Sequence, residues 1–177
     1  MRILYRVRQF WRTIFLITDR IDLDQARAHL NSAQWSLFSQ LQPAEQDHAL
    51  RMLRNLVDQG ENQPDLLVAA LLHDVGKLKY PLNPIERAVV VLVRASLPKY
   101  ARRWSQTPED GWEASPKWRK PFILAEQHAG WGANLARETG VSRLTEDLIR
   151  NHHDPQMAGG GEIANNLLHK LWMVDNE

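Results

Sequence analysis

The segment LLHDVGKL, residues 71–78, ends an apolar run with His73 and Asp74 side by side, followed by Gly76 and Lys77. An imidazole and a carboxylate are costly to bury unless another group binds them. In a helix, consecutive side chains diverge by about 100°, so these two converge only on a group that lies between their directions. We therefore expect a helix that presents both side chains to a bound cation.

Apolar residues recur at helical spacing on both sides of this segment, which predicts an all-α fold. Val89–Val93 is the one β-branched run that suits a strand, and its pattern also fits a helix. Helix breakers mark the expected ends: Pro43 and Pro64 at starts, Gly60 and Gly76 at ends. We expect a helical bundle.

The chain has 177 residues, of which 44% are apolar and 24% charged, as in a single globular domain. It has no cysteine, which excludes a disulfide framework, thiolate-bound zinc and a cysteine nucleophile. The apolar runs are far shorter than the roughly 18 residues that a membrane span requires, and the sequence has no recognisable secretory signal. These features favour one domain over residues 1–177 in the reducing cytoplasm.

The net charge of +1 is unevenly distributed. Residues 1–20 carry five Arg and one Asp, and residues 77–120 carry ten Lys or Arg and four acids, whereas the remainder is acidic. Two basic segments suit an anionic substrate or surface, and we expect no stable binding of nucleic acid. Ordinary solvated helix faces explain the same pattern equally well.

Two segments stand apart from the expected bundle. Residues 79–121 are basic and rich in Pro and Trp, which predicts a helical insertion followed by an irregular loop at a site entrance. Residues 1–20 are expected to contain an amphipathic helix, because Leu4, Val7 and Trp11 share a stripe within residues 2–17. That helix suits packing on the domain's own core or on a second subunit, or contact with an anionic membrane surface, which would make the protein peripheral to a membrane.

Seven histidines occur, and their neighbours separate them. His29 and His169 have no adjacent His or acid, so we interpret them as ordinary imidazoles. The remaining histidines and two aspartates form a nitrogen and oxygen ligand set without thiolates, which suits iron, manganese, cobalt, nickel or zinc. These candidates exceed the usual ligands of one ion, so two ions are expected. They are His48, His73, Asp74, His128, His152, His153 and Asp175.

The order of these residues resembles the HD-domain superfamily of metal-dependent phosphohydrolases, over roughly residues 43–175. Its minimal pattern matches His48, His73, Asp74 and Asp175, and is associated with one ion. The resemblance implies a helical HD domain and a phosphohydrolase activity, either phosphodiesterase or phosphomonoesterase. It also implies a small phosphorylated substrate, which is a nucleotide or another metabolite.

Two further elements are similar to two-metal sub-families such as the HD-GYP phosphodiesterases. The segment HAGWGA, residues 128–133, looks like their HPxxGA segment with Ala129 in place of Pro, and His152–His153 looks like their His pair. Lys77 falls where those enzymes place a lysine that contacts the substrate phosphate. The GYP motif is absent and the insertion after Lys77 is longer, which argues against a cyclic dinucleotide as the substrate.

The expected chemistry follows from two ions about 3.5–4 Å apart, which can share a carboxylate and convert a bridging water into hydroxide for attack on phosphorus. Asp74 is the expected bridging and catalytic group. Lys77, as a catalytic and substrate-binding residue, would neutralise phosphoryl charge, although it also suits a helix-end charge. Arg119 and Lys120 are expected to bind the substrate from the insertion.

Three interpretations of function remain open at this stage. The first is a phosphohydrolase with two metal ions, and the second is a nucleotide phosphohydrolase with one. The third is a binding protein that keeps the metal to stabilise its fold and senses a nucleotide without hydrolysing it. The sequence leaves the leaving group, the metal and the oligomeric state undefined.

Overall fold

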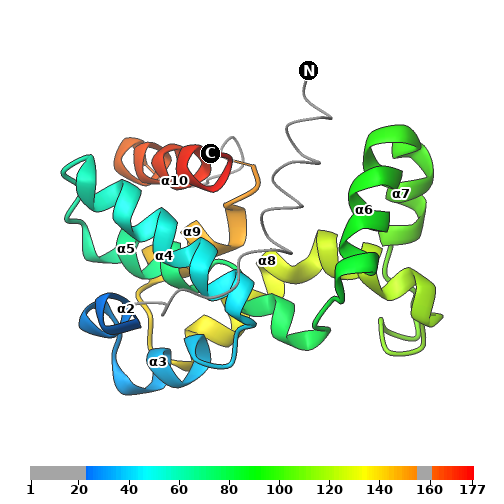
Figure 1. Ribbon diagram of the computed structural model, residues 1–177, viewed down its shortest axis with the longest axis horizontal. Coiled ribbons are helices and arrows are strands. Elements are labelled where there is room, and N and C mark those ends of the chain that lie inside the picture. Colours follow the sequence, from blue (N-terminus) through cyan, green and yellow to red (C-terminus); the bar gives the residue numbers. More distant parts are fainter. Residues whose placement is uncertain (1–22, 155–160) are drawn as a thin grey trace. The chain divides into compact units, whose positions relative to one another are not determined.

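The computed structural model describes residues 23–154 and 161–177, and within them the fold is all-α, as predicted (Figure 1). These residues contain no strand, and the run at residues 89–93 is helical. The helix expected within residues 1–20 lies outside the described part. In chain order the elements are α2 (Leu23–His29), α3 (Ser32–Phe38), α4 (Pro43–Asp58), α5 (Pro64–Leu72), η1 (Val75–Lys79), α6 (Pro84–Ser96), α7 (Pro98–Ser105), η2 (Lys117–Arg119), α8 (Lys120–Glu138), α9 (Arg143–Asn151) and α10 (Glu162–Asp175).

Prolines and a glycine set the ends of the central helices. Pro43 and Pro64 are the first residues of α4 and α5, where a missing N–H leaves no hydrogen bond unmade. Gly60, between these helices, has a φ of 83°, which glycine adopts without strain. α5 ends at Leu72 and the 3-10 helix η1 follows, so Gly76 lies inside a helical turn rather than beyond a helix end.

Contacts divide the chain into two compact units. One contains Tyr80–Glu126, and the other contains the described residues of Asp22–Lys79 and Gln127–Glu177. The unit from Tyr80 to Glu126 differs in its bounds from the expected insertion at residues 79–121, which stays a prediction. Whether the chain acts as one domain, as the sequence indicated, stays a prediction.

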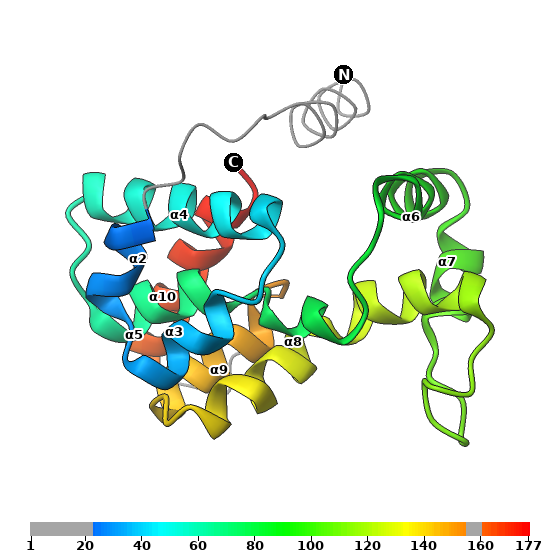
Figure 2. The same ribbon diagram turned by 60° about the horizontal axis from the view of Figure 1, so that its bottom comes forward.

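Helix α5 forms the centre of the larger unit (Figure 2). A helix that is apolar on all sides must be surrounded by other elements, and α4, α9 and α10 pack on α5 together with α2 and α3. This packing fixes the position of the residues that directly follow Leu72. The buried residues of α5 are Leu66, Leu67, Ala69, Ala70, Leu71 and Leu72.

In the Tyr80–Glu126 unit, α6 and α7 pack on each other and on the first turns of α8. Arg94 of α6 donates to Glu126 over 2.8 Å, and the Trp104 ring of α7 makes an edge contact with Phe122. Residues 106–116 form an irregular loop, which matches the predicted order of helices followed by a loop. None of the helices that the structure describes has the length and apolar character to cross a membrane.

Candidate metal centre

His73 and Asp74 lie where the chain turns from α5 into η1. His73 is the C-terminal cap of α5, and the amide of Lys77 donates to the carbonyl of Asp74 over 2.9 Å, which closes the following turn. His73 has no exposed surface and Asp74 has 2%. Two buried ionisable side chains require partners, and these come from four further helices.

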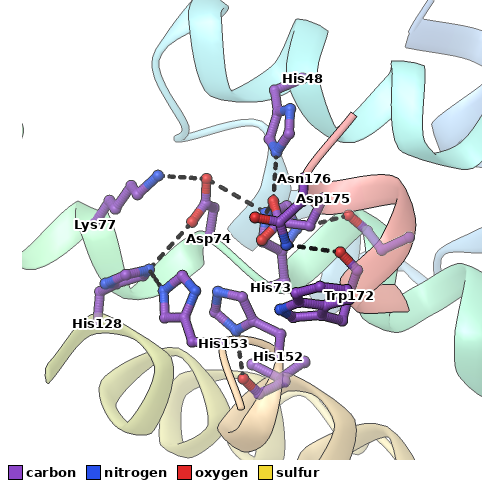
Figure 3. Close-up of polar contacts among 12 residues, drawn as sticks. His48, His73, Asp74, Lys77, His128, His152, His153, Trp172, Asp175 and Asn176 are labelled. Atoms are coloured by element: carbon purple, nitrogen blue, oxygen red, sulfur yellow. Dashed lines mark hydrogen bonds and ion pairs between the residues drawn. The ribbon is translucent and has the colours of Figure 1, made fainter. Parts of the chain in front are cut away.

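All seven metal ligands proposed from the sequence lie together at this point (Figure 3). His48 comes from α4, His128 from α8, His152 and His153 from the end of α9, and Asp175 from the end of α10. The residues form three overlapping groups whose ligand atoms lie within 4.8 Å of one another. The groups are His48, His73 and Asp74; His73, His152 and Asp175; and His128, His152 and His153.

One side of this cluster is built around Asp175 and His73. His48 Nε2 lies 2.9 Å from Asp175 Oδ1. His73 Nε2 lies 3.6 Å from the same oxygen and 3.4 Å from Asp74 Oδ2. Two carboxylates thus approach His73 Nε2, and one of them also pairs with His48.

The other side of the cluster is built around His128. Its Nε2 atom lies 3.0 Å from His153 Nε2 and 3.5 Å from Asp74 Oδ1. The two oxygens of Asp74 therefore face different histidines: Oδ1 faces His128 and Oδ2 faces His73. A carboxylate that bridges two ions needs this arrangement.

These spacings match those between ligands of a common ion. Two ligand atoms that each lie about 2.1 Å from an ion are about 3.0 Å apart along an octahedral edge and about 3.4 Å apart along a tetrahedral edge. The hydrogen-bonded and ion-paired ligand atoms in the cluster are 2.9 to 3.6 Å apart, and all ligand atoms within each group lie within 4.8 Å of one another. The side chains can thus bind ions with little rearrangement.

Backbone carbonyls orient two of the imidazoles. His73 Nδ1 donates to the carbonyl of Ala70 over 2.9 Å, and His152 Nδ1 donates to the carbonyl of Ile149 over 2.7 Å. Among the described residues, the buried Nε2 atoms of both histidines make no hydrogen bond. A metal-binding histidine commonly donates its other ring N–H in this way, so both Nε2 atoms fit a metal ion.

Electrostatics favour a cation between the two carboxylates. Burial opposes ionisation of Asp74, but Lys77 and then His73 outweigh it and hold the pKa of Asp74 well below its usual range. Burial likewise opposes ionisation of Asp175, but the hydrogen bond from His48 and the charge of His73 together outweigh it, so the pKa of Asp175 is also lowered. Both side chains are therefore anionic at neutral pH.

The pKa values of the histidines shift in opposite directions. Burial lowers the pKa of His73, but Asp74 and then Asp175 raise it to about 9. Burial and neighbouring imidazoles lower the pKa of His152 well below its usual range, and desolvation together with His128 lowers that of His153 to about 4. His73 is therefore protonated beside the two carboxylates, and an ion bound at its Nε2 atom would replace this proton. His152 and His153 are neutral and offer lone pairs to an ion.

Lys77 lies beside Asp74, three residues further along the chain and within η1. Its Nζ atom is 2.6 Å from Asp74 Oδ2. The Lys77 side chain is 33% exposed while that of Asp74 is 4% exposed, so a solute can reach the lysine side chain more easily than the carboxylate. The lysine can therefore pair with both the carboxylate and an incoming anion.

Arg119 and Lys120 belong to the Tyr80–Glu126 unit and make contacts there. The Arg119 guanidinium donates to the carbonyls of Gln106, over 2.9 Å, and Trp104, over 3.3 Å. Lys120 Nζ lies 5.1 Å from the centroid of the Trp112 ring. These contacts hold the loop at residues 106–116, and the predicted role of both residues in substrate binding stays a prediction.

A contact between two glycines holds α8 against η1. A Cβ atom built on Gly76 would lie 1.9 Å from the carbonyl oxygen of His128 and 2.7 Å from the amide nitrogen of Gly132. Only glycine allows this approach, which sets the position of His128 relative to Asp74. This role of Gly76 was not predicted from the sequence, although the small residues around Gly132 in HAGWGA, residues 128–133, indicate a close approach of the backbone.

The two histidines interpreted as ordinary imidazoles lie apart from the cluster. His169 is exposed and stacks on Trp172, and His29 lines a small surface pocket with Val57 and Leu67. Among the described residues, neither belongs to a group of potential metal ligands. The sequence context therefore separated these histidines from the other five.

Comparison with known proteins gives one result. A family model described as HD domain matches residues 46–171 of the chain. That range includes every candidate ligand except Asp175, which lies four positions beyond its end. Searches of curated proteins and of solved structures returned no match.

Proposed function

The chain belongs to the HD-domain superfamily of metal-dependent phosphohydrolases, and we propose that it hydrolyses a phosphate ester at a site for two metal ions. The observation that carries this proposal is the orientation of Asp74, whose two oxygens face different histidines. The ions would be held by His48, His73, Asp74, His128, His152, His153 and Asp175.

In this proposal the ligands divide between two positions joined by Asp74. His48, His73 and Asp175 would hold one ion, and His128, His152 and His153 would hold the other. The nitrogen and oxygen donors suit iron, manganese, cobalt, nickel or zinc. When bound, such ions acidify a water for attack on phosphorus and neutralise charge on the phosphoryl oxygens.

Lys77 would bind the substrate phosphate. Its side chain is partly exposed and its Nζ atom lies 2.6 Å from Asp74 Oδ2, so a phosphate beside Asp74 comes within reach of the same Nζ atom. The substrate we propose is a nucleotide or another small phosphorylated metabolite. Arg119 and Lys120 are proposed as further substrate contacts on the basis of the sequence alone.

A site for one ion is the main alternative. His48, His73, Asp74 and Asp175 form the minimal ligand set, and the short distance of 2.9 Å between His48 and Asp175 supports it. The close pair of His128 and His153, 3.0 Å apart, favours the second ion, because this pair has no role in the minimal set. A nucleotide sensor that binds metal without catalysis is a third interpretation.

Hydrolysis of a panel of phosphomonoesters and phosphodiesters, including nucleotides, tests the activity. The protein would be assayed with manganese, ferrous iron or cobalt, then with a chelator, then with the metal restored. We expect turnover that the chelator abolishes and the metal restores. A folded, metal-loaded protein that hydrolyses no member of the panel but binds a nucleotide would instead support the sensor.

A further inference from the structure

Helix α6 exposes an apolar face. Ile85, Val89 and Leu92 are 75%, 42% and 53% exposed. They follow one another at intervals of four and three residues, so they lie along one side of the helix. On another side Val90 is buried, and this side packs within the Tyr80–Glu126 unit. Soluble proteins rarely leave a continuous apolar stripe uncovered unless it binds something.

The charged residues of α6 form hydrogen bonds away from its exposed apolar face. Glu86 caps the start of the helix, Arg87 donates to the carbonyl of Leu82 over 3.3 Å, and Arg94 donates to Glu126 over 2.8 Å. These contacts draw all three charges away from the stripe of Ile85, Val89 and Leu92. The apolar face of α6 consequently carries no charged side chain.

Helix α7 packs on α6 (Figure 1). Ala101 and Ser105 are its buried residues, whereas Lys99, Arg102 and Arg103 are exposed. Residues 87–108 contain five Lys or Arg and no acidic residue. An uncharged apolar face on α6 and three exposed cations on α7 thus lie on two helices that pack on each other.

We propose that α6 and α7 form a docking surface for an anionic lipid membrane. The apolar face of α6 would enter the boundary between headgroups and acyl chains, while Lys99, Arg102 and Arg103 pair with lipid phosphates. The positive charge of α7 favours an anionic membrane over a second copy of the chain as the partner of this surface. A symmetric contact between two copies through this surface would bring two sets of like charges together.

A fluorescent label tests the surface directly in the full chain. Because the chain has no cysteine, a single introduced cysteine carries an environment-sensitive fluorophore without background. Leu92→Cys places it on the α6 face, and Ile163→Cys, at an isoleucine that is 73% exposed in α10, is the matched control. With vesicles rich in phosphatidylglycerol we expect a blue shift at position 92 and none at position 163, and no shift with phosphatidylcholine alone.

Vesicle sedimentation measures the apolar and the electrostatic contributions to membrane binding separately. Ile85→Ser should weaken binding about tenfold through lost apolar contact, whereas Ile163→Ser should leave it unchanged. Raising the salt from about 0.1 M to about 1 M shortens the Debye length from about 10 to about 3 Å and should release the protein. Circular dichroism would verify that each variant is folded.

Three results would overturn the proposal. The first is a wild-type protein that does not bind the anionic vesicles. The second is binding without a shift at position 92, which would place the contact in another segment, such as residues 2–17. The third is a shift at position 92 that depends on protein concentration without vesicles, which would identify a second copy as the occupant.

Discussion

Individual histidines in the cluster are distinguished by which ring nitrogen is available. The carbonyls of Ala70 and Ile149, each three residues before its histidine, accept from Nδ1 of His73 and His152 and direct Nε2 inward. The last turn of a helix leaves such carbonyls without intrahelical donors. A histidine just after a helix therefore acquires a fixed ring orientation from the helix itself.

Lys77 offers the clearest test of a single residue, because Lys79 is its neighbour in the same 3-10 turn. Lys77→Met should lower turnover about 10²-fold, as for loss of one group that stabilises developing negative charge, while metal content stays normal. Lys79 is exposed, so Lys79→Met should retain wild-type turnover. Equal rates for the two variants would reduce Lys77 to a helix-end charge.

His128 tests the second ion. His128→Ala removes a ligand that the minimal set does not use, so the number of bound ions should fall from about two to about one while the first ion remains. His29→Ala, at an exposed histidine outside the cluster, is the control. Elemental analysis of the folded protein measures the number of bound ions in both variants. If His128→Ala keeps the wild-type metal content, His128 does not hold an ion.

Among the elements, α5 and α8 are placed by different features of the sequence. The apolar run of α5 indicated a buried helix, and α5 is indeed the centre of its unit. The approach of α8 depends instead on Gly76 and Gly132, which are 56 positions apart in the sequence. Local patterns cannot reveal such a pair, because its role follows from a contact between distant backbones.

The glycine contact predicts an effect on metal binding at a distance from any ligand atom. Gly76→Ala places a Cβ atom 1.9 Å from the His128 carbonyl oxygen, so η1 and α8 must separate. We expect metal affinity to fall about 10- to 100-fold, as when a partner that orients a ligand is lost. Calorimetric titration of metal into the protein measures this change.

Gly130→Ala provides the control in the same helix. A Cβ atom at Gly130 meets only Arg150, at an ordinary distance of 3.8 Å. Alanine also favours the helix more than glycine does. This variant should therefore bind metal as the wild type does. If Gly76→Ala also retains wild-type affinity, the contact between η1 and α8 does not position His128.

At the scale of the whole chain, bound metal should stabilise the unit that contains the cluster. The ligands come from α4, α8, α10 and the ends of α5 and α9, so an ion ties distant segments together. A ligand at 100 times its dissociation constant adds about 2.7 kcal/mol to the free energy of unfolding. We expect manganese or cobalt to raise the unfolding temperature of the wild type but not of Asp74→Ala. An equal rise in both would place the metal elsewhere.

Much of this arrangement was predictable from the sequence. Helical periodicity and breakers indicated the helices, and the order of His and Asp residues pointed to the cluster that α5 and its neighbours assemble. The exposed stripe of Ile85, Val89 and Leu92 was not predicted, because an apolar stripe has the same pattern whether it packs inward or faces solvent. Exposure depends on which side of a helix its neighbours cover, and that information is tertiary.

Metal content tests the central claim most directly. The wild type and Asp74→Ala would be prepared anaerobically with excess metal, freed of unbound ions, and compared by elemental analysis. Asp47→Ala is the control, because Asp47 adjoins His48 but pairs with Arg51 at the surface. We predict about two ions per chain in the wild type and in Asp47→Ala, and none in folded Asp74→Ala. One ion in the wild type would favour the single-ion alternative, and full metal content in Asp74→Ala would contradict the proposed site.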